Sequence, residues 1–498
     1  MTLSPHLAMA FCIVAPLAAA MGAIVAGRHA PRLARPAAIL LALPALLAAA
    51  GVAGSGPLRV AVGGWEAPLG IALVADGLSG AFLVTTAAVM IGVVLAARPV
   101  FAMPRGETRA AYTFWPLAFF LWAALNAVFL SGDLFNLYVA LELLTLAAIG
   151  LVAIEGKAET IAAAIRYALF ALFGSLIYLL GAALLYATCG TLDMVLLADR
   201  VGDEPAALAA GALMTAGLAA KTALFPFHAW LPPAHSGAPA PASAMLSGLV
   251  PKASFYVVLR LWFDVMPDSA GQLLPQMLGA LGAAAILYGS LLAIRQDRLK
   301  LIVAYSTVAQ IGYLFLVFPL AGGGSAAQPW SAGAWTGGVF HALSHASAKA
   351  AMFLCAGLLL QAVGHDRLSG LTGTARTMPM TLFAFGLAAV TLMGLPPSGG
   401  FIAKYLMLTA ALAGGQIVWA AVMLAGGVLA AVYLFRPLTH AFARGAAEGT
   451  AAHAPVPRAH QAVPLVLAGL SILLGVASAG PYAFLQIGRP AAAEEGLE

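Results

Sequence analysis

The chain has 498 residues, of which 62% are hydrophobic and only 9% are charged, and its formal net charge is +5. A globular domain carries about 25% charged residues, so a soluble protein of this composition would lack the polar side chains that cover its surface. The composition therefore excludes a soluble enzyme. It favours an all-α protein that crosses a membrane many times, since each crossing needs about 20 apolar residues.

Apolar runs of this length follow one another through nearly the whole sequence and predict about fourteen transmembrane helices. The first run is interpreted as a retained helix, not a signal peptide, because no Lys or Arg precedes it. The polar stretch 436–461 is expected to be a solvated loop. The predicted helices lie near 6–26, 34–53, 74–97, 112–130, 134–154, 161–188, 206–232, 241–262, 272–294, 301–320, 333–361, 379–410, 415–435 and 462–484.

The basic residues are distributed unequally between the two sides of this arrangement. Connections after even-numbered helices hold only Arg59, Arg200, Arg260 and Arg489. Cytoplasmic connections are rich in Lys and Arg, so the asymmetry predicts a protein of the cell inner membrane with both termini outside the cytoplasm. The other side holds Arg28, Arg32, Arg35, Arg98, Arg105, Arg109, Lys157, Arg166, Arg295, Arg298, Lys300, Arg367, Arg376, Arg436, Arg444 and Arg458.

The four remaining basic residues, Lys221, Lys252, Lys349 and Lys404, fall inside predicted spans. An ionisable side chain at the bilayer centre is unfavourable by roughly 2.5–3.5 kcal/mol on insertion scales. A snorkelling lysine at a helix end would explain one such residue but not four. We interpret them as a proton relay, because desolvation and nearby charge lower the pKa of a lysine by several units. Glu142, in the fifth span, is the candidate counter-charge.

Histidines extend this set. His341 and His345 precede Lys349 at intervals of four residues, which predicts one shared helix face. His228 and His235 lie in and after the seventh span. Histidine titrates near neutral pH and suits a relay. A zinc site is the alternative for His341 and His345, but it needs further ligands and no carboxylate lies in this helix, so no metal is expected.

Two spans contain helix-breaking sequences near a lysine. Pro226 follows Lys221 in the seventh span, and Pro396 and Pro397 precede Lys404 in the twelfth. Corresponding breaks in two halves are typical of inverted-repeat transporters. We therefore expect inverted five-helix repeats at 112–262 (helices 4–8) and 272–435 (helices 9–13). Three helices at 1–111 precede them, and a cytoplasmic loop, a last span and a short tail at 436–498 follow.

Several segments resemble one known superfamily. The stretch KTALFPFHAWLPPAHSGAPAPASAMLSGLVPKASFYVVLR at 221–260 is similar to the signature of proton-translocating antiporter-like membrane subunits, and DRLKLIVAYSTVAQIGY at 297–313 and GLPPSGGFIAKYLM at 394–407 agree. The superfamily includes membrane subunits of respiratory NADH:quinone oxidoreductase and of the multisubunit (Mrp-type) Na+/H+ antiporter. The segments VGGWEAPLGIALVADGLSG at 62–80 and SGDLFNLYVALELL at 131–144 look most like the D-type subunit of that antiporter.

The resemblance implies a role for each candidate residue. It pairs Glu142 with Lys221, connects Lys252 to the input path, and places Lys349 with the two histidines on a hydrated central axis. Lys404 matches the lysine on the exit side. The implied function is a subunit of a multisubunit Na+/H+ antiporter. Its expected partners are the other subunits, Na+, H+ and membrane lipid, with no cofactor, nucleotide or nucleic acid.

Two alternatives stay open. The same relay would serve a proton-pumping subunit of a respiratory NADH:quinone oxidoreductase or of a membrane-bound hydrogenase, where electron transfer in other subunits supplies the drive. A structural subunit that only holds its partners together is the other alternative, and the four lysines inside spans argue against it.

Overall fold

The chain is almost entirely helical in a computed structural model that describes residues 4–103, 106, 108–202, 204–266, 271, 273–321, 329–443 and 456–489. Within these residues, twelve runs are long and apolar enough to cross a membrane. The first run contains two helices, α1 (Pro5–Ala26) and α2 (Ala30–Ser55). The shorter apolar helices α17 (Pro379–Met393) and α18 (Gly399–Ala413) together form one broken span. With these two adjustments, the predicted fourteen spans are confirmed.

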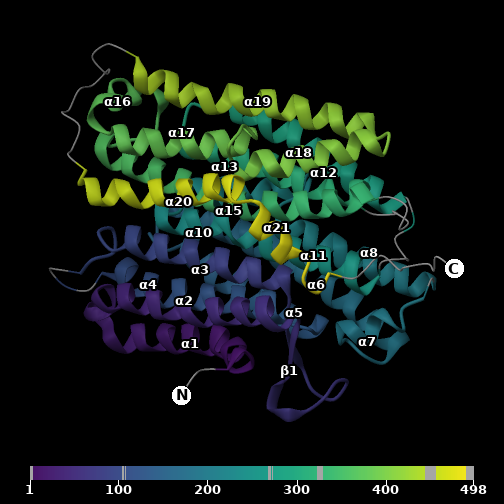
Figure 1. Ribbon diagram of the computed structural model, residues 1–498. Helices are drawn as coiled ribbons and strands as arrows, with labels where there is room; N and C mark the ends of the chain where they lie inside the picture. Colours follow the sequence, from purple (N-terminus) through teal and green to yellow (C-terminus); the bar gives the residue numbers. More distant parts are fainter. Residues whose placement is uncertain are drawn as a thin grey trace.

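The helices run side by side in one bundle, with α1–α4 at one flank and α19 at the other (Figure 1). Between them lie α10, α11, α13 and α15. The remaining helices are α3 (Gly77–Ala97), α4 (Arg109–Leu130), α5 (Leu134–Val152), α6 (Ala158–Cys189), α7 (Met194–Ala198), α8 (Pro205–Thr222), α9 (Leu231–Gly237), α10 (Ala240–Gly248), α11 (Val250–Arg260), α12 (Leu273–Ile294), α13 (Leu299–Phe315), α14 (Val317–Ala321), α15 (Pro329–Val363), α16 (Thr374–Thr377), α19 (Ile417–Phe442), α20 (Arg458–Val476) and α21 (Ala479–Leu485).

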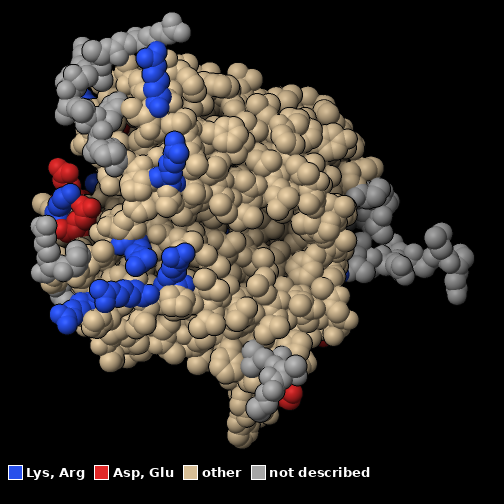
Figure 2. Space-filling model, turned by 60° about the vertical axis from the view of Figure 1, so that its left-hand side comes forward, with Lys and Arg blue, Asp and Glu red and all other residues tan. Residues whose placement is uncertain are grey.

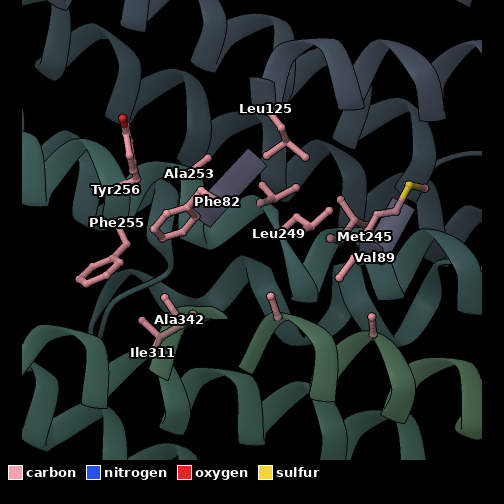
Figure 3. Packing of buried hydrophobic residues seen from close by; sticks show 14 of the residues in the cluster. Phe82, Val89, Leu125, Met245, Leu249, Ala253, Phe255, Tyr256, Ile311 and Ala342 are labelled. Atoms are coloured by element: carbon pink, nitrogen blue, oxygen red, sulfur yellow. The ribbon is translucent and has the colours of Figure 1, made fainter. Parts of the chain in front are cut away.

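The centre of the bundle is the pair α10 and α11, where the most apolar stretch of the run Ala240–Val265 is wholly buried by its neighbours. Phe82 of α3, Leu125 of α4, Met245 of α10 and Tyr256 of α11 pack together there (Figure 3). By contrast, only a third of the α1–α2 run is buried. When a helix is apolar on all sides but only one side is buried, its other sides face lipid or another subunit. The central helices are therefore those that hold buried polar side chains away from lipid.

Two small residues bring α6 and α8 into close contact. A Cβ atom on Gly217 of α8 would lie 2.2 Å from the carbonyl oxygen of Gly174 of α6. Small residues at such positions let helix backbones approach closely in membranes, where packing replaces the hydrophobic effect as the driving force. This close approach is next to Ser175 and one turn before Lys221, so it sets the geometry of the site described below.

A β-hairpin replaces the start of the predicted third helix. Residues Ala72–Ala75 form strand β2, which pairs antiparallel with β1 (Leu58–Ala61), so the prediction of helix from residue 74 was wrong. Helix α3 begins at Gly77 because Asp76 caps it: the Asp76 carboxylate accepts from the backbone amide of Ser79, and the Ser79 hydroxyl binds the Asp76 backbone amide. The hairpin projects from the bundle in Figure 1.

The predicted loop at 436–461 is shorter than expected. Helix α19 continues through Pro437 to Phe442, and α20 begins at Arg458, so both ends of this stretch are helical. Residues 444–455, which include Arg444, lie outside the described residues, as does Arg105. The last predicted span is divided into α20 and α21.

Lysine and arginine side chains gather at one end of the bundle (Figure 2), the end that is on the left in Figure 1. This end, here called the basic face, carries Arg28, Arg98, Lys157, Arg298 and Arg376 at the helix connections. Its assignment to the cytoplasm, like the division into two inverted repeats, stays a prediction.

Candidate functional site

Both predicted helix breaks are present, and they share one backbone pattern. Helix α8 ends at Ala223 in the left-handed conformation, with φ of 62°, and α17 ends at Gly394, with φ of 81°. After each left-handed residue, the next backbone amide donates a hydrogen bond to a carbonyl in the last turn of the helix. The Leu224 amide donates to the Ala219 carbonyl and the Leu395 amide to the Val390 carbonyl, each at 3.0 Å. Pro226 follows the first break, and Pro396 and Pro397 follow the second. The last carbonyls of α8 and α17 are thus free to accept side-chain donors.

The first break holds a buried ion pair. Lys221 Nζ lies 2.8 Å from Glu142 Oε1 and 2.9 Å from Thr145 Oγ1. The Ser175 hydroxyl of α6 donates to the same carboxylate oxygen. Lys221 is 5% exposed and Glu142 is 24% exposed. Three helices, α5, α6 and α8, therefore hold one carboxylate and one ammonium group in direct contact, which is the pairing that the resemblance implied.

Lys252 and Lys349 are held by neutral groups. Lys252 Nζ donates to the Ser247 carbonyl at 2.5 Å, and Lys349 Nζ donates to the Val303 carbonyl at 2.9 Å. Lys349 also donates to the Ser306 hydroxyl. Both lysines are fully buried, and neither has an ion-pair partner among the described residues.

His341 and His345 share one face of α15, as predicted. Their rings stack with centroids 5.6 Å apart, and His341 Nε2 lies 3.1 Å from the Gln310 carbonyl. Both ring nitrogens of His345 are buried without a hydrogen-bond partner in the described part of the chain. No group of three or more His, Cys, Asp or Glu side chains suited to a metal ion lies within that part.

Lys404 closes the second break. Its Nζ donates to the carbonyls of Leu392 at 2.8 Å and Met393 at 3.3 Å, which are the last carbonyls of α17. It also lies 4.1 Å from the ring centroid of Tyr313, a cation–π contact. The Gln310 amide donates to the same Leu392 carbonyl at 3.2 Å, so Gln310 connects the Lys404 site to His341.

One helix joins most of these sites. Along α13, polar groups at spacings of three or four residues contact successive members of the set, and we call them the α13 stripe. The Val303 carbonyl and the Ser306 hydroxyl bind Lys349; Thr307 lies 2.8 Å from Ser247, whose carbonyl binds Lys252. Further along, the Gln310 carbonyl contacts the His341 ring, and the Tyr313 ring forms the cation–π contact with Lys404. Such spacing keeps side chains on one helix face. The members of the stripe are Lys300, Val303, Ser306, Thr307, Gln310 and Tyr313.

His228 makes no hydrogen bond to another predicted relay residue in the described part of the chain. It lies in the short 3-10 helix Phe227–Trp230 after the first break. Its ring packs against Phe225 and Tyr288, with centroids 5.4 Å and 4.8 Å away. No hydrogen bond joins it to the candidate lysines among the described residues, and its role in a relay stays a prediction.

Two further buried groups lie near these sites: Lys300 was not predicted as a candidate from the sequence, and His235 was named only with the histidines in and after the seventh span. Lys300, counted with the basic connections, is 4% exposed, and its Nζ donates to the Ala238 carbonyl at 2.5 Å. His235 of α9 is 1% exposed, and both of its ring nitrogens lack partners in the described structure. The position of Lys300 inside the start of α13 could have marked it as a candidate. The burial of its side chain, however, depends on contacts with residues that are distant in sequence.

Arg260 was counted only with the helix connections, and the structure shows that it is buried. It forms a two-pronged ion pair with Asp76, with both N–O distances at 2.7 Å, and a further pair with Asp264 at 2.6 Å. Its Nε donates to the Tyr256 hydroxyl at 3.0 Å. A guanidinium is suited to such bidentate contacts. The cluster fixes the end of α11 to the start of α3, at the end of the bundle opposite the basic face.

Residues 131–430 match the family described as NADH:quinone oxidoreductase/Mrp antiporter, transmembrane. The chain belongs to this family. The matched segment contains all eight predicted relay residues, both breaks and the α13 stripe. The NADH:quinone oxidoreductase/Mrp antiporter family thus accounts for the part of the bundle that carries the site.

Relatives named as NADH-quinone oxidoreductase subunits and relatives named as antiporter subunits are both similar to this chain over most of their length. The N subunit of the NADH-quinone oxidoreductase of Desulforudis audaxviator is 37% identical over 435 residues, 84% of each chain. The D subunit of the Na(+)/H(+) antiporter of Alkalihalophilus pseudofirmus is 32% identical over 84% of this chain and 82% of its own. A chain in the Mrp complex from Dietzia has the same fold, with a TM-score of 0.86, 26% identity and 99% of both chains covered.

Proposed function

We propose that the chain is a proton-translocating subunit of a multisubunit Na+/H+ antiporter in the cell membrane. The observation that carries this proposal is the Glu142–Lys221 pair in the same bundle as two buried lysines that only neutral groups contact. Burial disfavours the charged form of a lysine, and a nearby carboxylate favours it. The protonation state of one group then shifts the protonation equilibrium of the next group. Coupling of this kind lets a row of interacting groups pass protons along.

The contacts suggest the order of the relay. Lys252 and Lys349 are joined through the Ser247–Thr307 contact and the α13 backbone. Lys349 is one helical turn from His345, whose ring stacks on His341, and Gln310 connects His341 to Lys404. Protons would pass along this line between Lys252 and Lys404, with the Glu142–Lys221 pair acting as a separate electrostatic control at the other flank.

The exposure of Glu142 supports partner subunits. It lies in the middle of α5, and its side chain is 24% exposed on a surface with Phe135, Val139 and Leu146. A carboxylate that faces lipid at this depth is strongly unfavourable. We expect another subunit of the complex to cover this surface. The membership of the Dietzia chain in an Mrp complex favours the same arrangement.

A proton-pumping subunit of a respiratory complex is the second candidate. The relative with 37% identity is named as the N subunit of an NADH-quinone oxidoreductase, and this observation favours it. The relay would be the same, and the drive would come from electron transfer in other subunits. The similarity over the full length of the Mrp chain favours the antiporter.

The test uses everted vesicles from antiporter-deficient cells that carry the full gene cluster. We expect that addition of Na+ collapses a preformed proton gradient in wild-type vesicles. We expect no such collapse in vesicles with assembled Glu142→Gln or Lys221→Met variants. If Na+ and K+ leave the gradient unchanged while electron donors drive proton pumping that the same variants abolish, the respiratory candidate replaces the antiporter. Unchanged transport in both assembled variants would overturn the relay itself and favour a structural subunit.

A further inference from the structure

A cavity of about 340 Å3 lies at the basic face, where several parts of the chain meet. The end of α3, the α5–α6 connection, the start of α10, the last turns of α15 and the start of α20 line it. A volume of this size holds on the order of ten water molecules. No part of the relay described above uses this cavity, although it lies directly over the central helices α10 and α15.

Two titratable side chains, Glu155 and His460, line the cavity together with the Gln361 amide. The other residues that line the cavity, such as Pro239 and Leu358, are apolar. The Nδ1 atom of His460 is buried and has no hydrogen-bond partner among the described residues. An imidazole and a carboxylate that line one cavity large enough for water are suited to passing protons to and from that water.

The floor of the cavity leads to a buried lysine. Pro239 and Ala240 line the cavity, and the carbonyl of the preceding residue, Ala238, accepts from Lys300 Nζ at 2.5 Å. Lys300 also lies within electrostatic range of Glu155. Lys300 therefore binds the backbone immediately before the lining residue Pro239.

Lys300 is the first member of the α13 stripe. Val303 and Ser306, one and two turns further along α13, bind Lys349. At a rise of 1.5 Å per residue, Lys349 lies about 7.5 Å along α15 from Leu354, which lines the cavity. His235, with two unpartnered ring nitrogens, lies within electrostatic range of Lys300, Lys252 and Lys349 together. Titratable groups thus follow one another from the cavity to the central lysines.

We propose that this cavity is the port through which protons pass between the basic face and the relay. Glu155 and His460 exchange protons with water at its mouth, and Lys300 and His235 carry them to Lys349 and Lys252. This inference rests on the proposed function, because it concerns the supply of protons to that relay. It adds an entrance and four residues to it.

The first test blocks the cavity in the assembled complex. Leu358→Cys is made in a Cys189→Ser background, since Cys189 is the native cysteine that is not fully buried. A sulfonate-bearing methanethiosulfonate reagent is added to everted vesicles, whose outer surface is the predicted cytoplasmic side. We expect Na+-driven gradient collapse to slow strongly after modification, toward the loss of about a hundredfold that removal of one proton-transfer group causes. Ala443→Cys, on the same face but outside the cavity, is the matched control and should keep its rate after modification.

The second test separates proton transfer from a structural role of Lys300. Lys300→Arg keeps a cationic hydrogen-bond donor for the Ala238 carbonyl, but an arginine side chain does not release its proton. We expect at least about a tenfold loss of transport with normal assembly, whereas Arg295→Met, an exposed change nearby, retains the wild-type rate. If Lys300→Arg transports normally, Lys300 is structural and the port is overturned.

The outcomes also distinguish the port from the proposed function. If Glu142→Gln and Lys221→Met abolish transport while the modified Leu358→Cys protein keeps its rate, only the port is wrong. If none of the variants affects transport in the assembled complex, the proposed function fails as well.

Discussion

Replacing Glu142 by Gln removes the only carboxylate that pairs with Lys221 in the described structure, and the effect can be worked from the geometry. At 2.8 Å, two unit charges attract by about 6 kcal/mol in a medium of effective dielectric near 20. Removing one member of a buried pair typically leaves a penalty of about 3–5 kcal/mol. Because about 1.4 kcal/mol corresponds to a factor of ten, even the lower bound shifts the equilibrium between charged and neutral Lys221 by about a hundredfold toward the neutral form. We therefore expect the assembled variant to lose most of its transport.

The assay is Na+-induced collapse of a proton gradient in everted vesicles, with the amount of assembled complex measured in the same membranes. Glu159→Gln is the control, since it removes a carboxylate from the exposed first turn of α6. Thr145→Val removes the hydroxyl that lies 2.9 Å from Lys221 Nζ and is expected to slow transport by about tenfold, because one hydrogen bond to a charged group contributes about 1.5 kcal/mol. The reasoning is refuted if assembled Glu142→Gln transports at more than half the wild-type rate.

Three further changes test other parts of the structure. Gln310→Leu removes the amide between α13 and α17 and should slow transport by about tenfold without loss of assembly; an unchanged rate would exclude Gln310 from the relay. Arg260→Met leaves Asp76 unpaired and should lower the free energy of unfolding by about 3–5 kcal/mol, measured by thermal unfolding in detergent. Burial alone raises the pKa of Asp76, but the Arg260 guanidinium outweighs it and holds that pKa below its ordinary value. The pair therefore stabilises the fold above about pH 4, and this contribution is lost as the pH falls through the lowered pKa, so an acid-insensitive difference between wild type and variant would contradict it. Gly217→Ala should separate α6 from α8 and reduce assembly, whereas Gly22→Ala, where no atom lies within 4 Å, should not; equal assembly of the two would contradict the packing argument.

The number of spans could be predicted because each one needs a long apolar run, and length alone decides it. The helix breaks could be predicted because Pro226 and Pro396 cannot continue a helix whatever surrounds them. The shared face of His341 and His345 follows from the helical period. These features depend on neighbours in sequence, and they are the ones that the structure reproduces.

The features that were missed depend on contacts between distant segments. Leu73 and Val74 are as apolar as the helix that follows them, and only pairing with β1 makes them a strand. Lys300 and Arg260 stand at helix ends, where a lysine or arginine is normally solvated. Their burial arises from the Ala238 carbonyl and from Asp76, which lie 62 and 184 residues away in sequence.

The α13 stripe has a mechanical consequence. Because one helix contacts the sites of Lys252, Lys349, His341 and Lys404, its backbone acts as a common rigid element. A shift of α13 along its axis by about 1.5 Å, the rise of one residue, would change the hydrogen-bond distances at all four sites in the same movement. Distant groups would then change state together without any direct interaction between them, and a spin-label distance between α13 and α15 would measure that displacement during turnover.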